Sequence, residues 1–209
     1  MDPNRLSIEV TERILEYAPE VYARWRAPAW WDAEGWRDVV PEAEWHRVLT
    51  HMRTQAIGGY HFVEVMYMRV VEAEGLSWKY EGYDFFEPPT GTAARSGSGY
   101  AKVVAAFGEE KLGRLHEAAG RYRLAYGDLP ATRDIFVCRQ DGAKVTPVRF
   151  VELKHKDAMA SRQLLGLALI QDILESPVEI VRFVSAGTRR APRTYRCDWP
   201  RGGFIRSVG

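Results

Sequence analysis

The spacing of apolar residues along the chain predicts several helices. Apolar positions recur at three- and four-residue intervals over 5–26, 41–54 and 59–74, which is the period of one helix face. Two further segments, 100–126 and about 158–175, are also predicted to be helical. In the first segment the spaced residues are Leu6, Val10, Ile14, Tyr17 and Val21.

Shorter runs rich in β-branched and aromatic residues predict strands between these helices. They lie at about 77–87, at DIFVCR and TPVRFVEL, and at 178–185. DIFVCR and TPVRFVEL are joined around Asp141-Gly142, a dipeptide favoured in tight hairpin turns, so they should pair antiparallel. The last strand follows a helix and should run parallel to the strand before that helix.

From residue 59 onward the predicted order is therefore helix, three strands, helix and strand. This order indicates an α/β fold with a mixed four-stranded sheet flanked by helices. We expect an N-terminal helical region over 1–55 packed on a core over 56–188, with a helical insertion at about 90–128. A basic C-terminal segment should follow over 189–209.

Four of the seven tryptophans lie between residues 25 and 36. Aromatic rings bury large areas, so these residues could build a small helical subdomain on the core. A base-stacking platform for nucleic acid is the alternative.

Charge is distributed unevenly, although the whole chain carries a formal net charge of only +1. Residues 176–209 hold seven arginines against two acids, a local excess that suits either phosphate contacts or a solvated tail. The two cysteines show no CxxC spacing, which argues against a disulfide framework or a structural zinc site. No signal peptide or membrane span is evident, so we expect a soluble cytoplasmic protein without a membrane partner.

Three charged residues stand in the predicted hairpin among apolar neighbours. Glu152 and Lys154 are two apart on one strand and share a face, and Asp134 opens the paired strand. Two carboxylates close together are costly to bury, and a divalent cation removes that cost. Oxygen ligands with few imidazoles favour Mg²⁺ or Mn²⁺. An ordinary salt bridge between Lys154 and one acid is the alternative.

Two further polar residues could join this site. Glu64 lies in the apolar stripe of the 59–74 helix, where a carboxylate needs a partner unless it reaches water at the margin of the stripe. Gln163 lies early in the next predicted helix, where it could bind a metal-bound water or a phosphate, or face solvent.

These residues resemble a PD-(D/E)XK nuclease, most closely the VRR-NUC type. The matching segments are Asp134-Ile135-Phe136-Val137, Phe150-Val151-Glu152-Leu153-Lys154, Asp157 and Gln163. The predicted order of helices and strands is also that of the family's restriction-endonuclease-like core, αβββαβ. The family's proline-aspartate pair is interrupted here, because Arg133 precedes Asp134.

The resemblance implies a Mg²⁺-dependent endonuclease that hydrolyses phosphodiester bonds, with Mn²⁺ as an alternative metal. Its metal ligands would be Asp134, Glu152, Glu64 and the backbone carbonyl of Leu153. Lys154 would position the attacking water, and Gln163 would match the family's helix glutamine.

The same resemblance implies DNA as the substrate, selected by its structure, with RNA left open. A homodimer is one expectation, because two cuts in a duplex usually need two sites. The residues expected to contact phosphates are Lys156, Arg162, Arg182, Arg189, Arg190, Arg193 and Arg196. The alternative is a non-catalytic nucleic-acid-binding or assembly protein on the same fold.

Overall fold

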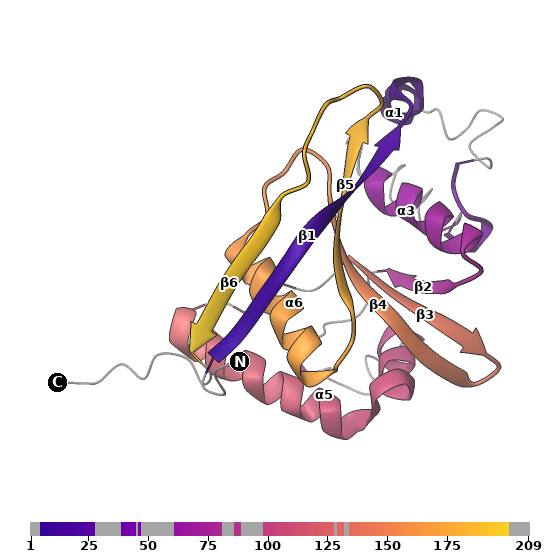
Figure 1. The fold of residues 1–209 in the computed structure, drawn as a ribbon. Helices are drawn as coiled ribbons and strands as arrows, with labels where there is room; N and C mark the ends of the chain where they lie inside the picture. The colour runs from indigo at the N-terminus through magenta and orange to yellow at the C-terminus, as the bar shows by residue number, and fades with distance from the viewer. Residues whose placement is uncertain are drawn as a thin grey trace.

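A mixed β-sheet forms the centre of the molecule (Figure 1). The computed structural model describes residues 5–27, 39–44, 46, 61–80, 86–88, 98–127, 129–131 and 134–200. Within them the sheet has six strands, in the order β2 (Ser77–Tyr80), β3 (Ile135–Asp141), β4 (Lys144–Lys154), β5 (Val178–Ser185), β1 (Arg5–Tyr17) and β6 (Thr194–Pro200). The α/β class is confirmed, and the sheet is two strands wider than predicted.

The strand directions divide the sheet into two antiparallel flanks and a parallel centre. β2, β3 and β4 pair antiparallel, and β6 pairs antiparallel with β1. β4, β5 and β1 run parallel, as predicted for β4 and β5. The carboxyl ends of these three strands therefore meet along one side of the sheet, which we call the carboxyl edge.

Helices cover both faces of the sheet (Figure 1). α5 (Ser98–Tyr126) and α6 (Ser161–Ile173) share a core with Phe136, Phe150 and Ile180. α3 (Phe62–Ala73) packs on the opposite face against Ile135 and Val151. α1 (Pro19–Arg26) follows β1 and buries Trp25 on the α3 side, and a 3-10 helix, η3, spans Glu42–Glu44.

Most of the predicted core elements are present. α3, β2, β3, β4, α6 and β5 follow one another in the predicted order, with α5 inserted between β2 and β3. The hairpin turn also lies where predicted, because Asp141 pairs with Lys144 and Gly142 adopts a φ of 57°. Of the strand predicted at about 77–87, β2 covers only Ser77–Tyr80.

The helix predicted over 5–26 is wrong for its first half, which is the 13-residue strand β1. Leu6, Val10 and Ile14 are four residues apart, and a spacing of four fits one face of a strand as well as one face of a helix. The buried Leu6 and Ile8 alternate with exposed Arg5, Ser7 and Glu9, which is strand periodicity. Residues 1–55 are therefore not a purely helical region packed on the core, because β1 is part of the sheet.

The basic C-terminal segment predicted over 189–209 contains a strand that the sequence analysis did not predict. Its residues 194–200 form β6, which pairs with the first half of β1 from Arg5 to Thr11. The second half of β1, from Glu12 to Tyr17, pairs with β5. β1 thus joins the predicted sheet to an additional edge strand.

Several predictions lie outside the described residues. They concern residues 47–54 of the helix predicted over 41–54, the loop over 90–97, the segment 201–209, and Trp30, Trp31 and Trp36. Of that helix, the described part contains the 3-10 helix η3. In the part of the chain that the structure describes, no helix combines the length and the apolar character needed to cross a membrane.

An ion-pair network around the buried Arg149 ties α3 to the middle of the sheet. Arg149 on β4 donates to Tyr67 at 2.9 Å and to Glu74 at 2.5 Å, and its Nε lies 3.4 Å from a Glu179 carboxylate oxygen. Burial raises the pKa of Tyr67 to about 12, so its hydroxyl stays protonated and can donate to Glu179 at 3.3 Å.

We predict that Arg149→Met lowers the free energy of unfolding by about 2 kcal/mol, because it leaves two carboxylates and a buried hydroxyl without their cation. Urea denaturation measures this change. The control is Arg123→Met, which removes an exposed ion pair with Glu87 and should cost less than about 1 kcal/mol. Equal losses in the two variants would contradict a stabilising role for the network.

Candidate functional site

Four charged side chains line one face of the sheet near its carboxyl edge and are almost completely buried. Their exposed fractions are 0% for Glu152, 2% for Lys154, 1% for Arg182 and 3% for Glu12. All four lie on the face covered by α5 and α6, because they alternate along their strands with residues packed on the other face. Such charges are stable in a protein interior only when they are paired.

Glu152, Lys154 and Asp157 form a continuous ion-pair chain. Lys154 Nζ lies 2.9 Å from Glu152 Oε1 and 2.7 Å from Asp157 Oδ2. Burial by itself lowers the pKa of Lys154, but the two carboxylates outweigh it and raise that pKa above its ordinary value. Lys154 is therefore a fixed, charged ammonium group at the carboxyl edge.

Gln163 brings α6 into the same cluster. Its side-chain amide donates to Glu152 Oε1, and its own Oε1 accepts a hydrogen bond from the Ala160 amide at 2.9 Å. Gln163 thus caps the start of α6 and holds the Glu152 carboxylate at the same time. The half-buried Gln163 side chain points at Glu152, a partner that neither alternative left open by the sequence had named.

Asp134 lies beside this cluster at the start of β3. Its Oδ2 accepts a hydrogen bond from the Leu153 amide at 2.7 Å. The register pairs Ile135 with Val151, so the next position places Asp134 opposite Glu152. In a β-strand the N–H and the C=O of one residue point toward the same neighbouring strand. Because the Leu153 N–H points toward Asp134, the Leu153 carbonyl points toward β3 as well.

Two carboxylates and a backbone carbonyl form a hard-oxygen donor set that suits Mg²⁺. This ion commonly uses one or two protein carboxylates, water and substrate phosphate rather than a complete protein cage. Among the described residues, no group of three or more His, Cys, Asp and Glu side chains is arranged to hold a metal ion. Among the described residues the fit therefore extends to Asp134, Glu152 and Leu153, and a bound Mg²⁺ would need further ligands.

Glu64 is not brought into this cluster. It lies in the first turn of α3, on the face of the sheet opposite to Glu152. The start of α3 does reach the carboxyl edge, because the Phe62 ring lies 5.9 Å from the His155 ring. Glu64 is therefore near this edge, but it completes no three-residue metal group.

Arg182 is a structural cation rather than a phosphate-binding residue, which corrects the sequence prediction. It donates from Nε to Glu12 Oε1 at 2.8 Å, and from Nη1 to the backbone carbonyls of His155 and Asp157 at 3.0 Å each. A side chain buried in this way cannot reach a nucleic-acid backbone.

Glu12 is equally well bound. Its Oε1 also accepts from the Tyr195 hydroxyl at 2.8 Å, and its Oε2 accepts from the Arg193 amide at 3.4 Å. Burial by itself raises the pKa of Glu12, but the hydrogen bonds from Tyr195 and Arg182 outweigh it and hold that pKa below 4.5, its ordinary value.

The other predicted phosphate contacts are exposed. They are Lys156, Arg162, Arg189, Arg190, Arg193 and Arg196. Arg196 pairs with Glu9 at 2.9 Å, and the Lys156 ammonium lies 5.2 Å from the centre of the Tyr22 ring. Arg189, Arg190 and Arg193 belong to the connection from β5 to β6, which begins at the carboxyl edge (Figure 1).

Sequence reasoning missed Glu12 and Tyr195, and it assigned Arg182 to phosphate binding rather than to Glu12. The signal was present, since Glu12 occupies an inward position in the alternating pattern of 6–14. It is visible only when this segment is interpreted as a strand. The contact between the Tyr17 hydroxyl and His155 Nε2, 2.7 Å apart, was missed for the same reason.

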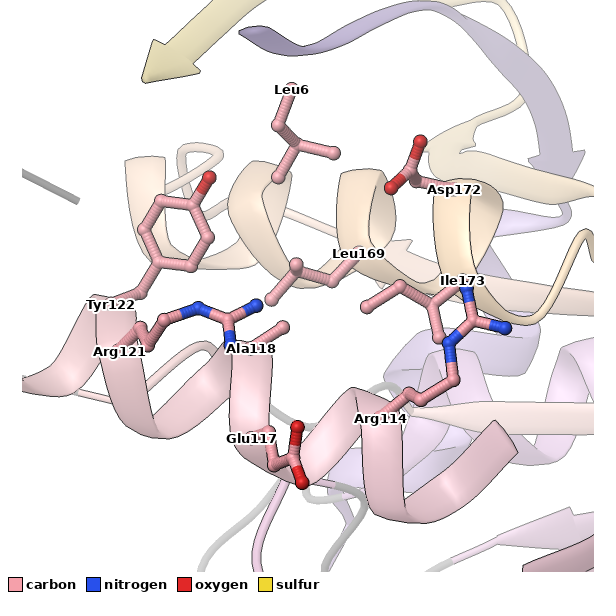
Figure 2. A pocket seen from close by; sticks show the side chains of 9 residues that line it. All are labelled: Leu6, Arg114, Glu117, Ala118, Arg121, Tyr122, Leu169, Asp172 and Ile173. Carbon is pink, nitrogen blue, oxygen red and sulfur yellow. The ribbon is translucent and has the colours of Figure 1, made fainter. Parts of the chain in front are cut away.

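A cavity of about 240 Å³ lies elsewhere, between α5, α6 and the start of β1 (Figure 2). Figure 2 shows Leu6, Leu169 and Ile173 beside Arg114 and Arg121. The cavity adjoins the last turns of α6, whereas Gln163 is in the first turn, so it is separate from the charged cluster.

Comparisons with known proteins yield no relative: no family model, no curated protein and no solved structure matches this chain.

We predict that replacing Glu12 makes stability less sensitive to acid. Its depressed pKa means that the ionised carboxylate contributes stability above pH 4.5, and that this contribution is lost as the pH falls through the lower folded-state pKa. The difference in the free energy of unfolding between wild type and Glu12→Gln should be largest near neutral pH and should decrease below about pH 4.5. Urea denaturation across this range measures it.

The control for this experiment is Glu16→Gln, an exposed position on the same strand. Its stability difference from wild type should be small at every pH. A difference for Glu12→Gln that stays constant from neutral to acid pH would show that its charge does not contribute.

Proposed function

We propose that this protein is a metal-dependent endonuclease that hydrolyses DNA phosphodiester bonds, of the PD-(D/E)XK type. The observation that carries the proposal is the buried Glu152-x-Lys154 pair on β4, with Asp134 beside it and Gln163 bound to Glu152. The order of α3, β2, β3, β4, α6 and β5 adds support, because it matches the αβββαβ core of that superfamily.

The energetic cost of this cluster supports a function for it. Replacing a buried ion pair with apolar residues of similar size is often neutral or stabilising, so stability alone is a weak reason to keep one. Buried charged groups also gather at functional sites, where their environment sets their protonation state. Here they lie at the carboxyl ends of parallel strands, a common location for ligand sites in open α/β sheets.

Each residue of the cluster has a defined task in this proposal. Asp134, Glu152 and the Leu153 carbonyl would hold Mg²⁺ or Mn²⁺, which would supply an activated water and neutralise charge on the scissile phosphate. Lys154 would donate hydrogen bonds from its fixed ammonium group to the water or to a phosphate oxygen. Gln163 would keep the Glu152 carboxylate in place.

Substrate binding would use the exposed cations around the same edge. Arg189 and Arg190 lie on the connection after β5, and Lys156 lies two residues after the end of β4. Contacts with phosphates from this rim would be independent of sequence, so selection would act on the shape of the DNA.

One observation favours a second function, a non-catalytic nucleic-acid-binding or assembly protein. Glu152 is already neutralised by Lys154 and bound by Gln163, so the cluster is electrostatically satisfied without a metal. In that case the exposed arginines would bind nucleic acid, and the ion pairs would serve stability only.

Cleavage of a labelled panel of duplex, single-stranded, flap and four-way-junction DNA tests the proposal. We expect cutting with Mg²⁺ or Mn²⁺ that EDTA abolishes. Glu152→Gln and Lys154→Ala should each lower the rate by about 100-fold or more, because each removes a group that acts on the developing charge. Lys144→Ala, at the far end of β4, is the control and should cut like wild type.

Circular dichroism and thermal melting must show that each variant is folded. If folded wild type binds the same DNA but cuts none of the panel with either metal, the nuclease proposal fails and the binding protein remains.

We also predict that Arg189→Ala combined with Arg190→Ala weakens DNA binding and reduces its salt dependence. Two lost phosphate contacts should reduce the slope of log affinity against log salt concentration by about 2. Fluorescence anisotropy across a salt series measures this slope. Arg139→Ala combined with Lys144→Ala removes two exposed charges from the hairpin tip and is the matched control. If the two double variants gave identical slopes of log affinity against log salt concentration, Arg189 and Arg190 would have no specific role in DNA binding.

A further inference from the structure

The buried pair formed by Glu12 and Arg182 lies next to the proposed active site. Glu12 was not among the predicted site residues, and Arg182 was predicted only as a phosphate contact. Glu12 is on β1, and Arg182 is on β5, directly opposite Lys154 in the register. The pair therefore lies on β5, the strand next to β4, and on β1, the next strand beyond β5, on the same face of the sheet.

Arg182 reaches beyond Glu12 to the turn that follows β4. While its Nε donates to Glu12, its Nη1 donates to the carbonyls of His155 and Asp157. One planar guanidinium thus binds a carboxylate and two backbone carbonyls, a combination that the single ammonium of a lysine cannot reproduce.

The same turn presents Asp157 to Lys154. Asp157 Oδ2 accepts from Lys154 Nζ at 2.7 Å, and Asp157 Oδ1 accepts from the His155 amide at 3.2 Å. Burial by itself raises the pKa of Asp157, but the hydrogen bonds from Lys154 and from the His155 amide outweigh it and lower that pKa. Contacts therefore run without a break from Glu12 through Arg182 and the turn to Lys154.

We propose that Glu12 and Arg182 are positioning residues that fix the 155–157 turn, so that Asp157 holds the Lys154 ammonium in its working orientation. The consequence for catalysis rests on the proposed nuclease function, whereas the fixing of the turn does not. The N-terminal strand would then complete the site, although it lies outside the core that the sequence resembles.

The first test is hydrogen exchange in Arg182→Lys. This variant keeps the buried positive charge but loses the planar set of guanidinium N–H donors. Exchange of the His155 amide should become about tenfold faster or more, because loosening the turn exposes its hydrogen bond to Asp157. The amides of β3 serve as an internal reference for global unfolding and should stay unchanged. Arg139→Lys, at an exposed site on β3, is the matched control.

The second test is a double-mutant cycle on cleavage with Arg182→Lys and Asp157→Ala. Arg182→Lys alone should lower kcat about tenfold while changing KM less than about twofold, because substrate contacts remain. In the Asp157→Ala background the same change should lower kcat less than about twofold, since both act through one turn.

These outcomes separate the two proposals. The positioning role is overturned if the His155 amide exchanges at the wild-type rate in Arg182→Lys. It is also overturned if Arg182→Lys lowers kcat by a further tenfold in the Asp157→Ala background. If wild type cuts no DNA, the nuclease proposal fails, and the exchange of the His155 amide alone decides whether the pair fixes the turn.

Discussion

Pairing of buried charges is the constraint on which the carboxyl edge of this sheet depends. Two acids and two bases lie under α5 and α6 with almost no exposure, and each is stable there only because of its partner. Glu152 is matched by Lys154, and Glu12 by Arg182. Removing one member would leave an uncompensated charge in the interior, so the four positions constrain one another through three adjacent strands.

The pairing of buried charges also makes β1 necessary to the carboxyl edge, although β1 lies far from the other strands of the cluster in the sequence. β1 supplies the carboxylate for Arg182, and it pairs with both β5 and β6. Through Tyr195 and the Arg193 amide, Glu12 also ties the β6 segment to the centre of the sheet. The edge strand, the turn after β4 and the proposed site are thus connected by one buried carboxylate.

The two faces of the sheet have different characters. The α3 face is closed around aromatic and aliphatic side chains, with the Arg149 network at the opposite end of α3 from Phe62. The α5 and α6 face is apolar around Phe136 and Phe150 and carries Glu152, Lys154, Arg182 and Glu12 toward the carboxyl edge. The Arg149 network and the proposed chemistry therefore lie on opposite faces of one sheet.

The local pattern of apolar residues was enough to predict the hairpin, α3, α6 and the parallel pair of β4 and β5. These elements combine a clear period with a turn or crossover that admits one topology. The grouping of Glu152 with Lys154 followed from strand alternation alone, and Asp134 followed from the hairpin register. Only the tertiary structure decided that residues 5–17 form a strand, because a spacing of four satisfies both periods and the neighbouring strands β5 and β6 select one. It likewise decided that Arg182 is buried, because its carboxylate partner lies 170 residues away in the sequence.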